Sequence, residues 1–157
     1  MKKHQYHSTI TWTGNRGEGT WSYHSYFRDH RIGSTGKPEI EGSADPAFRG
    51  DPEKYNPEEL FLSSIAACHM LWYLHLCADN GVTVVSYSDK AAGVMVEGKE
   101  GKGRFQLVIL NPVATILNSK NRDKALNLHK KANEMCFIAN SCNFPIEHKA
   151  QIQFQDL

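Results

Sequence analysis

One long apolar segment near the middle of the chain, with a helical start and a helical stop, constrains the fold most. The start is Asn56-Pro57-Glu58-Glu59, because Asn can cap a helix, Pro suits its first position and acids favour its positive end. Asn80-Gly81 predicts the stop, after about Asp79. Polar side chains interrupt the segment, so we expect a buried helix and not a membrane span: Ser63, Ser64, His69 and His75.

Composition narrows the class of protein. The length of 157 residues fits a single domain over residues 1–157, with 40% hydrophobic and 22% charged residues. Eighteen basic residues against seventeen acidic ones argue against a nucleic-acid surface and a polybasic membrane anchor. No apolar stretch follows Lys2 and Lys3, which argues against a signal peptide. We therefore expect a cytoplasmic protein.

The remaining elements are predicted from alternation, turn residues and helix caps. Residues 5–13 and 20–27 are expected to pair as a hairpin, and residues 28–55 to form a long loop with one short strand near 39–42. Later segments are predicted as strands (82–96, 104–110 and 146–154) and as a second helix from about 119–122 to 139. The order is β-β-α-β-β-α-β, an α+β fold.

Four cysteines, at positions 68, 77, 136 and 142, form no CxxC pair, which argues against a zinc ribbon and a thioredoxin motif. In a reducing compartment they are buried thiols, reactive thiols or both. Cys68 lies about ten residues inside the helix, beyond the reach of the helix dipole, so a reactive Cys68 would need another positive group beside it. Cys77 lies nine positions later, on the opposite side of the helix.

Simpler roles account for most of these side chains. Free cysteines are among the most buried residues, and composition alone favours Cys68 as a small buried side chain. We expect Cys77 and Cys142 to be structural. The histidines at 69, 75 and 129 lack the context of a metal site and are expected to be structural as well.

Two motifs resemble the OsmC/Ohr family of hydroperoxide reductases. Residues 56–68 (NPEELFLSSIAAC) are similar to the segment that opens the family's central helix and ends at its attacking cysteine. Residues 132–140 (ANEMCFIAN) are similar to the segment around its second cysteine, and residues 12–20 more weakly resemble its first hairpin. The resemblance covers nearly the whole chain and reverses the preference for a merely buried Cys68.

The resemblance implies an OsmC-like fold, in which two central helices are wrapped by sheets in an intertwined homodimer. It implies a peroxidase in oxidative stress defence that reduces organic hydroperoxides, and to some extent hydrogen peroxide. Metal, haem and flavin are not expected; an external dithiol, of lipoyl type or another thiol, would be the reductant. Three features depart from the family: Phe137 in place of proline, His69 after the attacking cysteine, and the long loop 28–55.

The resemblance also implies the roles of the site residues. Cys68 would attack the peroxide and become a sulfenic acid, and Cys136 would resolve it as a disulfide. The activating cation is either Arg49, which we favour, or Arg16. Glu58 is the expected carboxylate partner of the arginine, since about 15 Å of helix separates Glu58 from Cys68.

Several alternatives remain open. Apolar residues near the thiol could line a pocket for a hydrophobic hydroperoxide, or simply pack in the core: Phe48, Phe61, Met70, Leu71, Trp72 and Phe137. Glu58 and Glu59 could merely favour the helix start, and either arginine could be an ordinary surface residue. The function could instead be a dimer that binds a small apolar ligand, or a redox sensor; a zinc enzyme is a more distant alternative.

Overall fold

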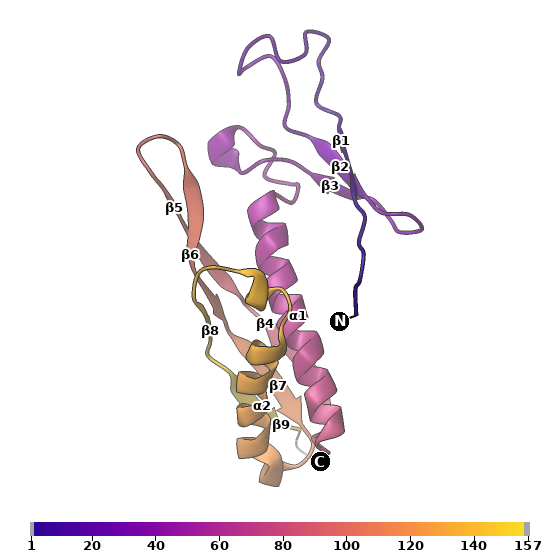
Figure 1. The fold of residues 1–157 in the computed structure, drawn as a ribbon, viewed down its shortest axis with the longest axis vertical. Helices are drawn as coiled ribbons and strands as arrows, with labels where there is room; N and C mark the ends of the chain where they lie inside the picture. Colours follow the sequence, from indigo (N-terminus) through magenta and orange to yellow (C-terminus); the bar gives the residue numbers. More distant parts are fainter. Residues whose placement is uncertain (1, 156–157) are drawn as a thin grey trace. The chain divides into compact units, whose positions relative to one another are not determined.

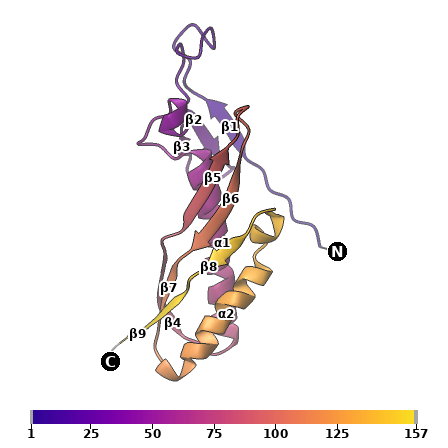
Figure 2. The same ribbon diagram turned by 90° about the vertical axis from the view of Figure 1, so that its left-hand side faces the viewer.

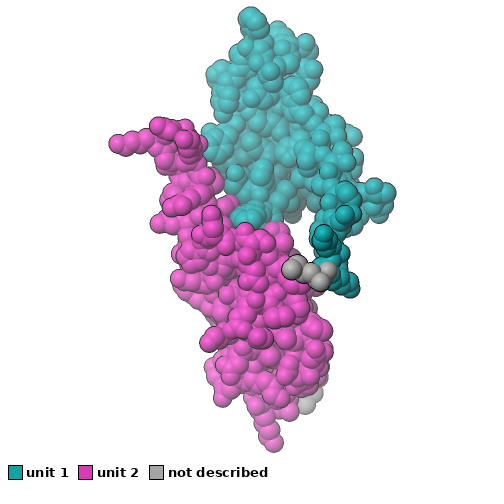
Figure 3. Space-filling view, in the orientation of Figure 1, with its two compact units in different colours: residues 1–61 teal, residues 62–157 magenta. Residues whose placement is uncertain are grey.

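The computed structural model describes residues 2–155 and divides into two compact units, residues 1–61 and residues 62–157 (Figure 3). The first unit contains a three-stranded antiparallel sheet of β1 (Thr9–Trp12), β2 (His30–Gly33) and β3 (Ile40–Gly42), in that order. A short 3-10 turn, η1 (Pro46–Phe48), follows β3, and the helix α1 (Pro57–Asp79) begins at the end of this unit (Figure 1).

The expected first hairpin is wrong in its second strand. β1 pairs with β2, and residues 20–27 form turns. Arg28 explains the difference, because its guanidinium lies 4.3 Å from the ring centre of Tyr23 and 4.2 Å from that of Tyr26. It also donates hydrogen bonds to the backbone carbonyls of both tyrosines, so these residues are held in a stacked loop. The expected short strand near residues 39–42 is confirmed as β3, while β2 also lies within the predicted loop.

Helix α1 starts and stops where the sequence predicts. The Glu59 backbone N–H donates to Asn56 Oδ1 at 2.8 Å, and the Asn56 N–H donates to Glu59 Oε2 at 3.1 Å. This reciprocal pair is a capping box, which satisfies donors that the first helical turn leaves free. Gly81, with φ of 68°, takes the left-handed conformation that ends the helix.

The second unit holds two further three-stranded sheets. One has the order β4 (Val84–Asp89), β7 (Pro112–Ile116), β9 (Gln151–Phe154), and the other β5 (Ala92–Glu97), β6 (Gly103–Leu110), β8 (Ile146–His148). The β4–β7 and β5–β6 pairs are antiparallel, whereas β8 and β9 join β6 and β7 in parallel. Elements and topology together make an α+β fold, as predicted.

Two predicted strands, 82–96 and 146–154, are each divided in the structure, and β7, which follows the predicted strand 104–110, was missed. The breaks lie at residues 90–91, 111 and 149–150, where the chain passes from one sheet to the other. Hydrogen bonds connect the three segments at these breaks. The Asn111 N–H donates to Asp89 Oδ1 at 2.7 Å, and the Lys149 N–H donates to the Leu110 carbonyl at 2.8 Å. Proline is tolerated as the first residue of a strand, and Pro112 begins β7.

Helix α2 (Arg122–Met135) follows a 3-10 turn, η2 (Ser119–Asn121). The predicted end at about residue 139 is too late, because the helix stops at Met135 and a second turn, η3 (Ala139–Ser141), follows. Cys136 is therefore the first residue beyond α2, with extended backbone angles.

The core of the second unit lies between the two helices and the β4-β7-β9 sheet (Figure 2). Helix α1 buries one residue per turn on this side, and α2 contributes small ones: Ile65, His69, Tyr73 and Cys77 from α1, Ala125, His129 and Ala132 from α2. The polar exception is a hydrogen bond of 3.1 Å between His69 Nε2 and His129 Nδ1. The Tyr73 ring stacks on the face of the His129 ring, with 3.7 Å between centroids, while His69 contacts the edge of the same ring through the hydrogen bond.

The rest of α1 is less covered than the sequence suggested. By length and composition alone α1 could cross a membrane, with a mean hydropathy of 1.5, so the expectation that it is too polar does not hold by this criterion. A core helix has the same composition, and α1 does bury one face. Only 22% of its apolar window is buried, however, and Leu71 is 63% exposed.

The buried histidines predict an acid-sensitive fold. Burial, the largest cause, lowers the pKa of His69 from its usual 6.5 to about 4 and that of His129 to about 3. The unfolded chain therefore binds more protons between these values and pH 6.5, so stability is complete above pH 6.5 and falls as the pH drops towards 4. From pH 7.5 to pH 5, linkage gives a loss of about 2 kcal/mol for each histidine.

Urea unfolding at both pH values measures this loss. The matched control is the double variant His69→Gln, His129→Asn, because glutamine places an amide near the Nε2 position and asparagine near the Nδ1 position, and neither titrates. The wild type should lose more stability on acidification than this variant. Equal losses in the two proteins would show that the pair is not the acid-sensitive element.

Candidate active site

The structure brings together the two predicted redox cysteines, Cys68 on α1 and Cys136 directly after α2. Their thiols share a side-chain hydrogen bond. The two sulfurs differ in access: Cys68 is partly exposed, whereas Cys136 is 0% exposed. A molecule approaching from solvent therefore meets the Cys68 sulfur first.

The chain around Cys136 is fixed by its own hydrogen bonds. The Ala139 N–H donates to Cys136 Sγ at 3.4 Å, and the Asn140 N–H donates to the Cys136 carbonyl at 3.0 Å. Asn140 Nδ2 also donates to the Glu134 carbonyl at 3.0 Å, which ties the turn back to the last turn of α2. These bonds hold the buried thiol in one place without the proline expected after it.

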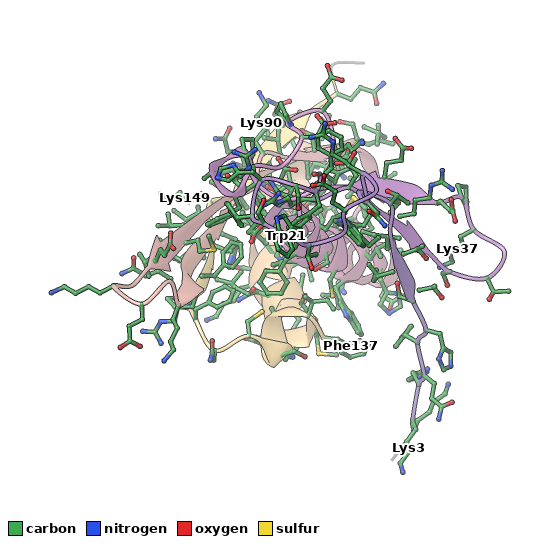
Figure 4. All side chains as sticks on the ribbon, turned by 90° about the horizontal axis from the view of Figure 1, so that it is seen from above. Lys3, Trp21, Lys37, Lys90, Phe137 and Lys149 are labelled. Atoms are coloured by element: carbon green, nitrogen blue, oxygen red, sulfur yellow. The ribbon has the colours of Figure 1, made fainter. Side chains whose placement is uncertain are left out.

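Phe137 occupies the position of that expected proline, and its side chain is 66% exposed (Figure 4). Its ring meets Trp72 of α1 edge to face, with 5.6 Å between ring centres. The structure thus places two of the predicted pocket residues beside each other next to the thiols. Leu71 is at the surface, and Phe48 and Phe61 belong to the first unit.

Cys136 keeps its proton at neutral pH. Burial is the main cause that raises the pKa of its thiol to about 11, and the hydrogen bond with Cys68 raises it further. A protonated Cys136 can donate its S–H to the Cys68 sulfur. The pair is therefore asymmetric, with a buried proton-bearing thiol behind an accessible one.

The two other cysteines lie in packed surroundings. Cys77 is 1% exposed, in the core and on the floor of a hollow of about 340 Å³ between the end of α1 and the start of β4. Cys142 lies beyond α2, as expected, and its thiol donates to the Ile138 carbonyl at 3.2 Å. Burial raises the pKa of both thiols, which fits the structural roles that the sequence predicts for them.

Arg49 is the one non-glycine residue among residues 2–155 with a positive φ, 66°. It ends the turn η1, where its N–H donates to the Pro46 carbonyl at 3.0 Å. Such a conformation is uncommon outside glycine and is found disproportionately at functional sites. Gly50 follows it, and a Cβ there would lie 1.6 Å from the Ala44 carbonyl oxygen, so only glycine fits where the loop returns to Ala44.

A partly buried ion pair between Lys54 and Asp29 supports the loop that carries Arg49. The Lys54 ammonium bonds Asp29, and this hydrogen bond is the largest cause that lowers the pKa of that carboxyl group. Ser43 donates to Asp29 at 3.0 Å and accepts from the Asp51 N–H at 3.1 Å. The loop that carries Arg49 is therefore anchored to the end of the first sheet.

Arg16 and Glu58 also belong to the first unit. The Arg16 guanidinium lies 4.8 Å from the ring centre of Phe27 and lines a polar hollow of about 350 Å³. Glu58 is in the first turn of α1, ten residues before Cys68 on the same helix. Since the thiols belong to the second unit, the arrangement of Arg16, Arg49 and Glu58 around them stays a prediction.

The part of the chain that the structure describes holds no group of three His, Cys, Asp or Glu side chains arranged for a metal ion. His75 pairs instead with Asp79 on the surface of α1. The hydrogen bond between His69 and His129 was not predicted. Its one signal was spacing, since His69 shares the helical face of Ile65, Tyr73 and Cys77.

Comparison with known proteins agrees with this fold. A family model described as OsmC-like protein matches residues 50–151. An OsmC-like protein of unknown function from Vibrio cholerae is 28% identical, with a TM-score of 0.82 over 96% of this chain and 100% of that one. An organic hydroperoxide resistance protein from Elizabethkingia anophelis is 20% identical, with a TM-score of 0.68 over 98% and 100%.

A third structure shares the fold at lower similarity. The organic hydroperoxide resistance protein OhrB of Bacillus subtilis is 19% identical, with a TM-score of 0.62 over 94% of this chain and 98% of that one. None of the curated proteins matches this chain. The family match spans both predicted cysteine motifs, and the chain belongs to the OsmC-like protein family.

Proposed function

We propose that this protein is a thiol-dependent peroxidase that reduces organic hydroperoxides, and to a lesser extent hydrogen peroxide, in oxidative stress defence. The observation that carries the proposal is the contact between an accessible Cys68 and a buried, protonated Cys136. Family relatives named as organic hydroperoxide resistance proteins support it.

The first step takes place at Cys68. Its thiolate attacks the terminal oxygen of the hydroperoxide, so an S–O bond forms, the O–O bond breaks and an alkoxide leaves and takes a proton to become the alcohol. The sulfur is oxidised by two electrons to a sulfenic acid, and the peroxide is reduced by the same two. Partial exposure suits Cys68 to meet a substrate from solvent.

The second step takes place at Cys136. Its sulfur attacks the sulfenic sulfur, an S–S bond forms, the S–O bond breaks and the thiol proton leaves with the hydroxide as water. Because the pKa of Cys136 is raised, attack by its sulfur requires that the thiol proton passes to the leaving hydroxide in the same step. An external dithiol, of lipoyl type or another thiol, then reduces the disulfide and is itself oxidised to a disulfide.

The proposed activating group is Arg49, with Arg16 as the alternative and Glu58 as the carboxylate that orients the arginine. A guanidinium stays charged when it is desolvated and can bond a thiolate and a carboxylate together. The positive φ of Arg49 and the anchored loop around it favour this residue. No such strain is found at Arg16, whose guanidinium stacks on Phe27.

A homodimer in the cytoplasm is the proposed form of the protein. Helix α1 leaves apolar side chains such as Leu71 exposed, and exposed apolar surface on this scale is typical of an interface. A second copy would cover α1, as the family fold requires. The thiol chemistry and the dithiol reductant suit a reducing compartment.

Turnover of cumene hydroperoxide with dihydrolipoamide tests the peroxidase directly. The wild type should turn over, and Cys68→Ser should lose turnover entirely, because the nucleophile is gone. Cys136→Ser should complete one turnover and then accumulate sulfinic acid, which mass spectrometry detects. Cys142→Ser is the matched control and should stay active.

No turnover by wild-type protein with free thiols, on either organic or hydrogen peroxide, would contradict the proposal. The better hypothesis would then be a non-catalytic dimer that binds a small apolar ligand. A Cys68–Cys136 disulfide that forms with peroxide but is not turned over by any dithiol would favour the redox sensor.

Alkylation kinetics test the asymmetry of the pair. With its pKa near 11, Cys136 in the folded protein should react with iodoacetamide at pH 8 about a hundredfold more slowly than an unperturbed thiol, since only the thiolate reacts. Tandem mass spectrometry of the digested wild-type protein separates the Cys136 rate from those of the other thiols. The same protein in guanidinium chloride is the control, and equal rates in both states would contradict the assignment.

Sedimentation velocity tests the dimer. The wild type should sediment at twice the mass of one chain, 17.7 kDa. Leu71→Lys places a charge on the exposed face of α1 and should shift the protein towards the monomer, because an unpaired charge is costly in an apolar interface. A wild type that sediments as a monomer at micromolar concentration would overturn the dimer.

A further inference from the structure

The hydrogen bond between His69 and His129 is a feature that the proposed chemistry does not use. The two rings are 1% and 0% exposed, and their other nitrogens, His69 Nδ1 and His129 Nε2, are buried without a partner within residues 2–155. Burying polar atoms without partners costs free energy that an apolar pair would not. The histidine pair therefore stabilises the fold less than an apolar pair would, and its value lies in specifying one arrangement of α1 and α2.

The hydrogen bond fixes how α2 lies along α1. The other buried residues of α2, Ala125 and Ala132, are small and apolar, and such side chains have no directional preference that would fix the register of a helix. A hydrogen bond is directional and is lost within a few tenths of an ångström beyond its normal length. Tyr73, stacked on His129 with 8° between the ring planes, holds the ring in the orientation that the bond needs.

The same register decides where the two sulfurs meet. Cys68 precedes His69 on α1, and Cys136 follows His129 by seven residues, directly after the last residue of α2. A disulfide requires Cα atoms within about 4.4–6.8 Å of each other and a narrow range of torsion angles. A shift of α2 by a fraction of a turn would therefore separate Cys136 from Cys68.

We propose that His69 and His129 are positioning residues, whose hydrogen bond holds α1 and α2 in the register at which Cys68 and Cys136 join as a disulfide. This inference rests on the proposed resolving role of Cys136. Neither histidine touches the substrate; both act through the helices that carry the thiols.

Burial is the largest cause that favours the neutral form of the pair, and His148 adds to it. Tyr73 faces it from α1, Tyr87 from β4 with 6.4 Å between ring centres, and His148 from β8 at 5.7 Å from His69. Asp89 lies further along β4, where its charge acts on Tyr87. A neutral imidazole offers one N–H and one lone pair, which is what the pair needs; two imidazolium rings would have no acceptor between them.

The test compares amides that keep the hydrogen-bonding position with amides that miss it. His69→Gln and His129→Asn keep a polar atom near Nε2 and Nδ1, whereas His69→Asn is too short and His129→Gln too long. All four replace an imidazole with a carboxamide, so their cost to folding is similar. The measurement is the equilibrium of the Cys68–Cys136 disulfide with glutathione at pH 7, on proteins that circular dichroism shows to be folded.

We expect the matching variants to hold the disulfide about as strongly as the wild type. The mismatched variants should lower its equilibrium constant about tenfold, which equals a reduction potential about 30 mV less negative. A purely structural role would lower the melting temperature of all four variants and leave the potential unchanged. Equal potentials in the matching and mismatched variants would overturn the proposal.

The glutathione measurement uses no peroxide, so it separates this inference from the peroxidase. A wild type that forms the disulfide with the expected pattern among the variants, but does not reduce hydroperoxides, would sustain the positioning role and contradict the enzyme. A wild type that forms no Cys68–Cys136 disulfide with oxidised glutathione would overturn the positioning role.

Discussion

The contact between α1 and α2 is the constraint on which the second unit depends. Helix α1 buries one residue in each turn, and the side chains of His69 and Tyr73 reach across to His129 of α2. The β4-β7-β9 sheet then closes the core around Tyr73 and Ala114. Because Cys68 lies beside the buried face and Cys136 lies at the end of α2, the packing that forms the core also forms the thiol pair.

The sequence predicts what local rules control. The capping box and the glycine stop locate α1 to the residue, since both depend on side chains within a few positions. The pair of cysteines was predicted from resemblance and not from physics, because nothing local indicates that residues 68 and 136 meet. The family was recovered for the same reason, because the motif at 56–68 is long and specific, whereas the α+β class followed from the order of the predicted elements.

What the sequence could not predict depends on distant partners. The strand breaks at 90–91 and 149–150 arise where the chain passes from one three-stranded sheet to the other. Hydrogen bonds such as that from Asn111 to Asp89 stabilise these breaks and join residues 22 positions apart in the sequence. Residues 20–27 have β-rich composition, yet stacking on Arg28 holds them as turns. The histidine pair joins residues 60 positions apart, and each looks like an ordinary core or surface residue until the helices pack.

The chemistry of the site follows from unequal burial of similar groups. Two thiols in contact would be equivalent in water; here burial keeps the proton on Cys136, while partial exposure leaves Cys68 open to a substrate. The two histidines, buried to the same degree, both remain neutral and can share one proton between facing nitrogens. Since the arrangement of α1 and α2 sets both pairs, a change that loosens it should disturb the proposed resolving step before it disturbs the proposed attack by Cys68.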